Sequence, residues 1–397
     1  MGLGLPWRSS KKVHPGAQLI VGQEAVAAAG ADLSARIAAS GGIEPSLRLQ
    51  LWPPLLGLAP WPMAPHMNET ASLEAEYTSL LSRSSSVDLS LMRTIDADVP
   101  RTDGDLSPGE CAVLRDLLMA HCVLQPAWGY FQGMNDIGRV ILAAHAAAAH
   151  GAHDVHPTPG ATDAAPPPPP RVSSSRVAPS SGVAEPAAAE GGGSGVGASD
   201  ACSSTEGMGG TEAGTSDVLS PASLGVVFWL LRGVLAHSSD NWAHESLGGV
   251  WRQARAVNRI LHIADPKLAR RLDALEREQF KGGGLAGERE QPLAVLFGPI
   301  FLRLKREMLD VEEAMRLWEV CWANGRHFHV LALAALVLTQ RKPILRLRGA
   351  SGFGELHRLF GALHGTMRAA TLLAGARALA AQPAVLAALE ITMGGTA

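Results

Sequence analysis

The sequence predicts an all-α fold in which one multi-helix domain is interrupted by a low-complexity insertion. Apolar residues recur at three- and four-residue spacing in several segments, which is the pattern of amphipathic helices. Strand-like alternation is scarce, and aromatic residues make up only 5% of a chain that is 47% hydrophobic. Much of the apolar content is alanine, the strongest helix former, so helix is favoured over sheet.

The best-marked helix begins after Ser107. Ser107, Pro108 and Glu110 form a capping box with proline at the first helical position. Apolar residues follow at helical spacing, and Gln125-Pro126 is expected to end this helix. Further amphipathic helices are expected at residues 224–235, 248–263, 266–278, 311–322, 328–338 and 353–363.

Residues 151–220 differ sharply in composition from the rest of the chain. They contain a Pro166–Pro170 run, then Ser, Gly, Ala and Glu with almost no large apolar residue. Such a stretch buries too little surface to offset the entropy of ordering it, so a disordered insertion is predicted. The expected organisation is an N-terminal extension at 1–40, a first domain part at 41–150, the insertion at 151–220 and a second domain part at 221–397.

Charge and cysteine content exclude several classes of function. The formal net charge of -3 leaves no basic footprint for nucleic acid. The four cysteines are far apart and form no Cys-x-x-Cys pair, which indicates reduced thiols rather than a disulfide framework or a zinc site. The longest apolar run, Val330–Leu338, is far shorter than the roughly 20 residues of a membrane-spanning helix. It predicts a buried helix in a cytoplasmic protein.

The first segment that carries chemistry lies just before the capped helix and contains Arg101. This arginine is expected on a loop, between the acidic residues Asp98 and Asp103. An ordinary interpretation is a surface arginine paired with one of those two carboxylates, because exposed ion pairs are common.

The second segment, Trp128–Asp136, lies in the bend between two helices. Gly129 and Gly133 flank Gln132, and glycine permits the unusual dihedrals that would present this side chain outward. The alternative is a plain interhelical turn in which Tyr130 and Met134 pack inward.

Taken together, the two segments resemble a known pair of motifs. Ile95-x-x-Asp98-x-x-Arg101 followed by Tyr130-x-Gln132 is similar to the paired signature of the TBC domain, the catalytic domain of Rab GTPase-activating proteins. Further stretches resemble other parts of that domain in order: Gly42-Ile43, Leu47-Arg48, Trp52–Gly57, Phe228-Trp229, Asn241-Trp242, Ala264–Leu268, Lys305–Glu307, Leu317–Trp322 and Phe328–Leu338.

The resemblance implies a role for each motif residue. Arg101 would be an arginine finger that stabilises charge on the phosphate of GTP, and Gln132 would orient the attacking water in place of the partner's own glutamine. Asp98 would orient Arg101, and Tyr130 would brace the loop that carries Gln132. Ile95, Gly129, Gly133 and Met134 would support the two motifs.

The implied partner is a GTP-bound Rab-family small GTPase. The chain lacks a Gly-x-x-x-x-Gly-Lys-Ser/Thr pattern, so GTP and Mg²⁺ are expected to be bound by that partner, and no cofactor or metal site of the chain's own is expected. The protein would activate a GTPase in trans rather than hold a substrate itself. It would lie at the periphery of endomembranes and reach them only through its partner.

The sequence differs from the family pattern at one place, and two other functions are possible. Gly298-Pro299 falls where the family usually continues a helix, so a kink or a new helix start is expected there. The chain could instead be a TBC-domain adaptor that binds a GTPase with little or no activation. A helical scaffold without GTPase binding is the other alternative.

Overall fold

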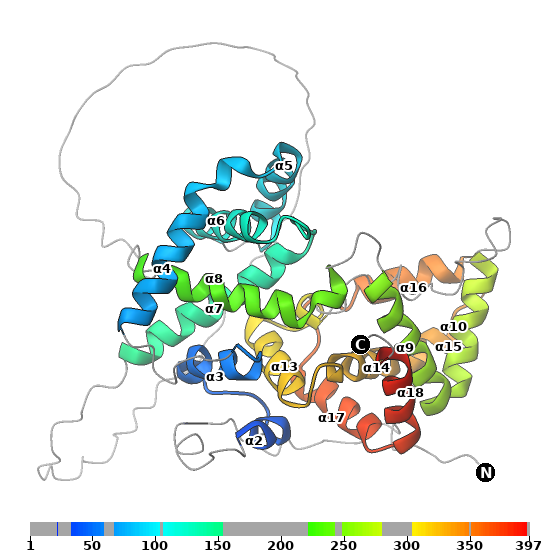
Figure 1. Ribbon diagram of the computed structural model, residues 1–397. Coiled ribbons are helices and arrows are strands. Elements are labelled where there is room, and N and C mark those ends of the chain that lie inside the picture. Colours follow the sequence, from blue (N-terminus) through cyan, green and yellow to red (C-terminus); the bar gives the residue numbers. More distant parts are fainter. Residues whose placement is uncertain are drawn as a thin grey trace, which may run out of the picture. The chain divides into compact units, whose positions relative to one another are not determined.

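The computed structural model describes residues 22, 33–58, 67–103, 106–153, 221–242, 248–279, 304–348 and 351–394. All of these belong to one compact unit. Over these ranges the chain is helical and no strand of more than an isolated bridge residue is described; one such bridge joins Met308 and Met367. The predicted all-α fold is therefore confirmed (Figure 1).

Within each continuous described range, short connections join one helix to the next. Their bounds are α2 Leu33–Ala39, α3 Arg48–Leu55, α4 Met67–Ser82, α5 Leu89–Asp98, α6 Pro108–Leu124, α7 Met134–His153, α8 Pro221–His237, α9 Gly248–Ala264, α10 Pro266–Gln279, α13 Val311–Ala323, α14 Phe328–Thr339, α15 Arg341–Arg346, α16 Gly352–Gly361, α17 Ala369–Ala380 and α18 Pro383–Met393. Each helix expected from the sequence is present. Among the described residues no single helix could span a membrane, although the bent pair α17 and α18 passes that test by length and composition.

Local signals in the sequence correctly located the ends of α6. The Ser107 hydroxyl accepts from the Glu110 backbone N–H while the Glu110 carboxylate accepts from the Ser107 N–H, which completes the capping box. The helix ends at Gln125, as the following proline indicates. By contrast α7 continues to His153, past the boundary expected at 151. Residues 154–220 and Gly298-Pro299 lie outside the described residues.

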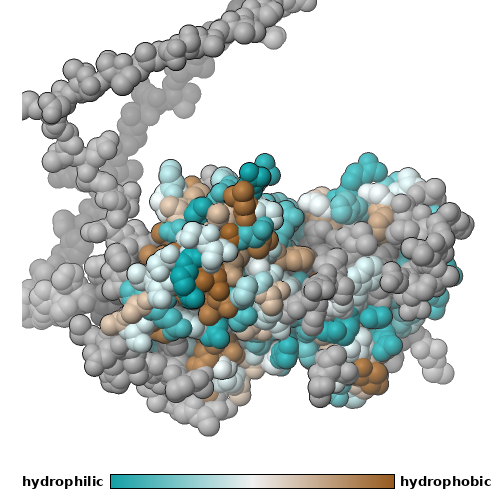
Figure 2. Space-filling model, turned by 45° about the horizontal axis from the view of Figure 1, so that its top comes forward, coloured by the Kyte–Doolittle hydropathy of each residue, from teal (hydrophilic) through white to brown (hydrophobic). Residues whose placement is uncertain are grey.

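Helix α14 is the centre of the core. Every residue from Phe328 to Leu338 is buried, and the helix packs against α9, α13 and α17. A helix that is apolar on all sides needs such an enclosed place, so the apolar run is a core helix as expected. On the face shown in Figure 2, apolar side chains stand in small groups among polar ones and do not form a continuous apolar surface.

A buried ion pair joins the beginning of the fold to α13. Arg48 and Glu319 are both fully buried, and Arg48 Nε donates to Glu319 Oε1 over 2.7 Å. Arg48 also pairs with Glu312, with Nη1 and Nη2 at 2.6 and 2.7 Å from the two carboxylate oxygens. The Trp52 indole and the Ile43 backbone N–H donate to Glu319 over 3.0 and 2.8 Å. The buried charges are therefore fully hydrogen-bonded, which such pairs require.

Removing Arg48 should destabilise the protein strongly. In Arg48→Met, Glu319 would remain buried without its cation, at an expected cost of about 3–5 kcal/mol in the free energy of unfolding near pH 7. Burial already raises the pKa of Glu319 to about 7, against the effect of Arg48. Arg48 lowers the pKa of Glu319, so without it the folded variant would bind a proton more tightly than the folded wild type, and the deficit relative to wild type should shrink as pH falls to about 5.5. Urea titrations at both pH values measure this.

Glu319→Gln is the matched control. It keeps one acceptor oxygen, which serves either the Trp52 or the Ile43 donor because these two bind different carboxylate oxygens, and Arg48 keeps its bidentate pair with Glu312. We expect a clearly smaller loss than for Arg48→Met. Equal losses in the two variants, or a deficit of Arg48→Met that does not depend on pH, would contradict this account of the pair.

Two histidines of the helical core, His121 and His329, are buried in their neutral form, and a third, His237, is half-buried and also neutral. Burial lowers the pKa of His121 and of His237 to about 4, and that of His329 to about 3. His329 Nε2 lies 3.0 Å from the Gln253 side-chain oxygen, so the neutral ring donates there. Protonating any of these rings would place a charge in the core.

The free energy of unfolding should therefore fall in mild acid. The folded-state pKa values lie below the ordinary value of 6.5, so the unfolded chain binds protons that the folded chain cannot. Stability is retained above about pH 6.5 and lost towards pH 4, by at most about 1.4 kcal/mol per pH unit for each histidine. Urea unfolding at pH 7, 6 and 5 tests this. In His121→Leu the free energy of unfolding should depend less steeply on pH, by the slope that corresponds to at most one proton taken up on unfolding. A wild-type free energy of unfolding that stays constant from pH 7 to 5 would contradict this role of the histidines.

Candidate functional site

Arg101 lies at the end of a short helical turn. Helix α5 ends at Asp98 and continues into the 3-10 turn Val99–Arg101, so the arginine is not on an open loop as the sequence suggested. Proline suits the second position of this turn because its missing N–H would have no partner there. The Thr102 hydroxyl donates to the Asp98 carbonyl over 3.2 Å and closes the turn.

The guanidinium of Arg101 is exposed and makes no hydrogen bond or ion pair with any other described residue. Its two acidic neighbours are engaged elsewhere. Asp98 binds the Tyr130 hydroxyl, and Asp103 pairs with Lys305 and Arg139. The alternative interpretation, in which Arg101 pairs with one of these carboxylates, is not what the described residues show, and Asp98 does not orient Arg101 by direct contact.

Two glycines shape the turn that presents Gln132. Gly129 has φ +59° and Gly133 has φ +107°, both in the region that side-chain-bearing residues rarely adopt. Between them the chain turns from α6 into α7, and the Gln132 side chain is exposed. The sequence interpretation of the two glycines is confirmed.

A buried hydrogen-bond network ties the two motifs together. The Tyr130 hydroxyl lies 2.9 Å from Asp98 Oδ2 and 2.9 Å from Asn135 Oδ1. Asn135 Nδ2 donates to the Thr102 hydroxyl over 2.9 Å, and Asn135 Oδ1 accepts from the Gly133 N–H over 3.0 Å. Burial, followed by the bond to Asp98, raises the pKa of Tyr130 well above its usual range. Tyr130 thus braces the Gln132 turn, and Asp98 acts on Tyr130.

Two further motif residues, Ile95 and Met134, pack in the core next to the site. Ile95 and Met134 are fully buried in the core. The Met134 sulfur lies 3.4 Å from the Phe131 backbone nitrogen, at the start of α7. These two side chains fix the backbone on either side of the exposed Arg101 and Gln132.

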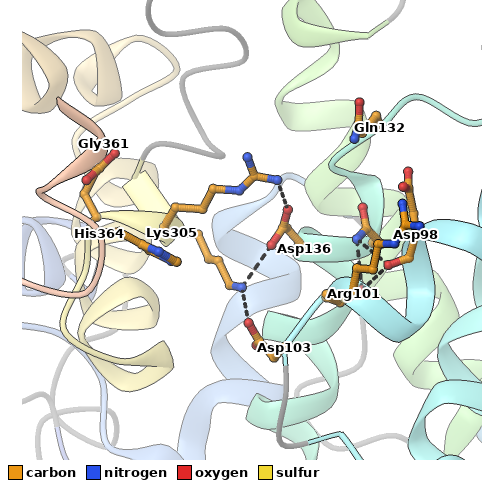
Figure 3. A pocket seen from close by; sticks show the side chains of 12 residues that line it. Asp98, Arg101, Asp103, Gln132, Asp136, Lys305, Gly361 and His364 are labelled. Carbon is orange, nitrogen blue, oxygen red and sulfur yellow. Dashed lines mark hydrogen bonds and ion pairs between the residues drawn. The ribbon is translucent and has the colours of Figure 1, made fainter. Parts of the chain in front are cut away.

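Arg101 and Gln132 line one open pocket of about 420 Å³. Figure 3 shows them with Asp98 on one side, His364 and Gly361 on the opposite side, and Lys305 and Asp136 between. The other lining residues are Thr102, Asp103, Asn135, Arg306 and Glu307. Most of this lining is polar or charged, which suits a phosphate-bearing group better than an apolar ligand.

Sequence reasoning missed the basic wall of this pocket. Lys305-Arg306-Glu307 was interpreted only as a stretch resembling part of a later helix, yet Lys305 and Arg306 both pair with Asp136 in the pocket. The local sequence held little signal, because Lys305 follows Leu304 but precedes the charged Arg306 and Glu307, so nothing nearby indicated a buried lysine with a carboxylate partner. The identity of that partner could not be read from the chain.

Comparison with known proteins agrees with the motif pattern. Residues 45–152 match the model of the Rab-GTPase-TBC domain family, and this range includes Arg101 and Gln132. The chain is similar in structure to the Ypt/Rab-GAP domain of Gyp1p, with 14% identity, a TM-score of 0.57, and 90% of this chain and 92% of that chain covered.

A second solved structure has a similar fold. The Chlamydomonas flagellar RabGAP TBC domain has 16% identity and a TM-score of 0.51, with 87% of this chain and 84% of that chain covered. No curated protein sequence matches the chain. The resemblance to the TBC family is thus confirmed by the family match, and the two structures establish the fold.

The chain has two tyrosines, which offer a matched test of the bracing network. Tyr130→Phe should cost about 1.5–3 kcal/mol in the free energy of unfolding, because it removes a hydrogen bond to a charged carboxylate. Tyr77→Phe is the control, since Tyr77 is also buried but no described side chain bonds to its hydroxyl. Urea unfolding should show a much smaller loss for Tyr77→Phe. Equal losses would mean that the Tyr130 bond does not hold the motifs together.

Proposed function

Because the chain carries a Rab-GTPase-TBC domain, we propose that it is a GTPase-activating protein for a Rab-type small GTPase. One observation carries the proposal. An arginine that pairs with no other described residue and an exposed glutamine line a single polar pocket, and a buried network holds their backbones in place. Arg101 and Gln132 would enter the partner's active site together.

Arg101 would stabilise charge in the transition state. Transfer of the γ-phosphoryl group to water spreads negative charge over the phosphate oxygens, and an arginine supplied in trans is worth on the order of 10³–10⁵ in rate. A guanidinium suits this role because its planar fork contacts two oxygens and stays charged at any working pH. Since Arg101 has no carboxylate to leave, it can turn towards the phosphate without breaking an ion pair.

Gln132 would hold the attacking water. A carboxamide can accept a hydrogen bond from that water while donating to a phosphate oxygen, which aligns the water with phosphorus. The positive φ angles of Gly129 and Gly133 support this role, because they project the turn away from the core. In this arrangement Gln132 takes the place of the glutamine that a GTPase ordinarily supplies.

The partner would bring the nucleotide and the metal. GTP and Mg²⁺ would be bound by the GTPase, and this chain would contribute side chains alone. Such a protein would work at the periphery of endomembranes, where its GTP-bound partner resides. An adaptor that binds the GTPase without activating it is the alternative, and the availability of both Arg101 and Gln132 favours activation.

Hydrolysis measurements test the proposal. A panel of GTP-loaded Rab proteins should include at least one whose hydrolysis the wild-type chain accelerates. On that GTPase, Arg101→Ala should lower kcat by about 10³ or more, and Gln132→Ala by about 10² or more. Arg101→Lys should not restore the rate, because an ammonium lacks the planar fork.

Arg255→Ala is the control, since Arg255 is exposed on α9 and does not line the pocket. It should leave the rate unchanged. Full activity of Arg101→Ala or of Gln132→Ala would remove the role assigned to that residue. Binding of GTP-loaded Rab without any acceleration by the wild type would favour the adaptor.

A further inference from the structure

Lys305 bridges the two motif segments from beneath the pocket. Its side chain is 8% exposed, and its Nζ donates to Asp103 Oδ1 over 2.7 Å and to Asp136 Oδ1 over 2.9 Å. Asp103 comes two residues after Arg101, and Asp136 comes four residues after Gln132. One buried cation therefore holds a carboxylate from each segment.

The bridge is separate from the Tyr130 network. That network joins Asp98 and Thr102 to the Gln132 turn by direct contact. Lys305 instead joins the chain after Arg101 to the first turn of α7, and it comes from a part of the sequence more than 160 residues away, at separations of 202 and 169. The Tyr130 network holds residues on both sides of Arg101, and Lys305 adds a contact to Asp103 after it, so that together they restrict its backbone.

The segment that carries Lys305 is itself anchored. The carbonyl of Arg306 accepts from the Gly365 N–H over 3.0 Å. The carbonyl of Glu307 accepts from the N–H groups of Thr366 and Met367 over 3.1 and 2.8 Å. The same turn carries His364, which lines the opposite side of the pocket. Lys305 is thus held on a fixed backbone rather than at the end of a loose loop.

We propose that Lys305 is a positioning residue that sets Arg101 relative to Gln132 and neutralises the two carboxylates beneath them. The proposal rests on the proposed function, because it concerns the same reaction. Lys305 does not need to touch the GTPase. It acts through Asp103 and Asp136, whose spacing it fixes.

Electrostatics gives the bridge a second effect on the reaction. Asp98, Asp103 and Asp136 all line the pocket into which a triphosphate would be brought. Without Lys305, only Arg139 would remain at Asp103 and only Arg306 at Asp136 among the described residues. The two less neutralised carboxylates would then repel the charge that develops on the phosphate and also repel each other. Arg306 replaces Lys305 only in part, because it reaches Asp136 alone and its side chain is 47% exposed.

The test compares three lysine variants of the full chain on the activated GTPase. Lys305→Met keeps the stem and removes the charge, Lys305→Arg keeps a cation, and Lys342→Met makes the same change at an exposed position on α15. We expect Lys305→Met to lower kcat about 10- to 100-fold, since small misplacements of catalytic groups cost up to about 10²-fold. Lys305→Arg should recover most of this loss, and Lys342→Met should match wild type.

Binding measurements separate positioning from loss of structure. The Kd for the GTP-loaded GTPase should change less than about threefold in Lys305→Met, because ground-state docking does not depend on the exact aim of Arg101. Binding to the GTPase loaded with GDP and aluminium fluoride, a mimic of the transition state, should weaken about as much as kcat falls. Hydrogen exchange should rise at residues 98–103 and 129–137 and stay unchanged in α14.

Asp103→Asn is the second variant, in case Lys305→Met does not fold. It removes one of the two anchors and leaves Lys305 paired with Asp136, so a smaller fall in kcat with unchanged Kd is expected. If the wild type accelerates hydrolysis while Lys305→Met and Asp103→Asn keep its kcat, the Lys305 proposal alone fails. It also fails if only the Kd changes. If the wild type accelerates no GTPase, the proposed function fails and takes this proposal with it.

Discussion

The buried pair of Arg48 and Glu319 is the contact on which the arrangement of the site depends. It fastens the start of the fold to α13 across 271 residues of sequence. Helix α13 follows directly after the segment that carries Lys305, and both α3 and α13 pack against α7, whose first turn carries Asp136. Arg48 and Glu319 are both removed from water, and each charge has its hydrogen-bond partners only in this geometry. A displacement of either side chain would therefore leave a buried charge without a partner. The Arg48–Glu319 pair is therefore linked to the pocket through helices α3, α13 and α7, which pack against one another.

The pocket itself combines residues with opposite requirements. Tyr130, Asn135 and Lys305 are buried and hydrogen-bonded, while Arg101 and Gln132 are exposed and make no side-chain hydrogen bond or ion pair with another described residue. This division is expected of a site that acts on another molecule, because a side chain already paired within its own fold would have to break that pairing to act. The satisfied residues hold the backbone, and the exposed pair remains available for a partner.

Much of this could be predicted from local sequence. The capping box of α6, the buried run of α14 and the two glycines beside Gln132 depend on neighbours within a few residues, and the structure bears out each of them. The predicted role of Asp98 was less accurate, because its side chain has two candidate partners within reach and the chain alone does not choose between them. Lys305 was missed as a site residue because its partners lie 169 and 202 residues away.

The sequence by itself determined the helical fold, the positions of most helices and the two motifs that resemble those of the TBC domain. These follow from periodicity, capping and backbone preferences, which act over single turns. Only the tertiary structure decided that Arg101 stands unpaired, that Asp98 serves Tyr130, and that a lysine from the second half of the chain completes the site. Such pairings depend on which polar groups come together when distant segments pack. A buried cation takes its partners from residues close to it in space, which need not be its neighbours in sequence.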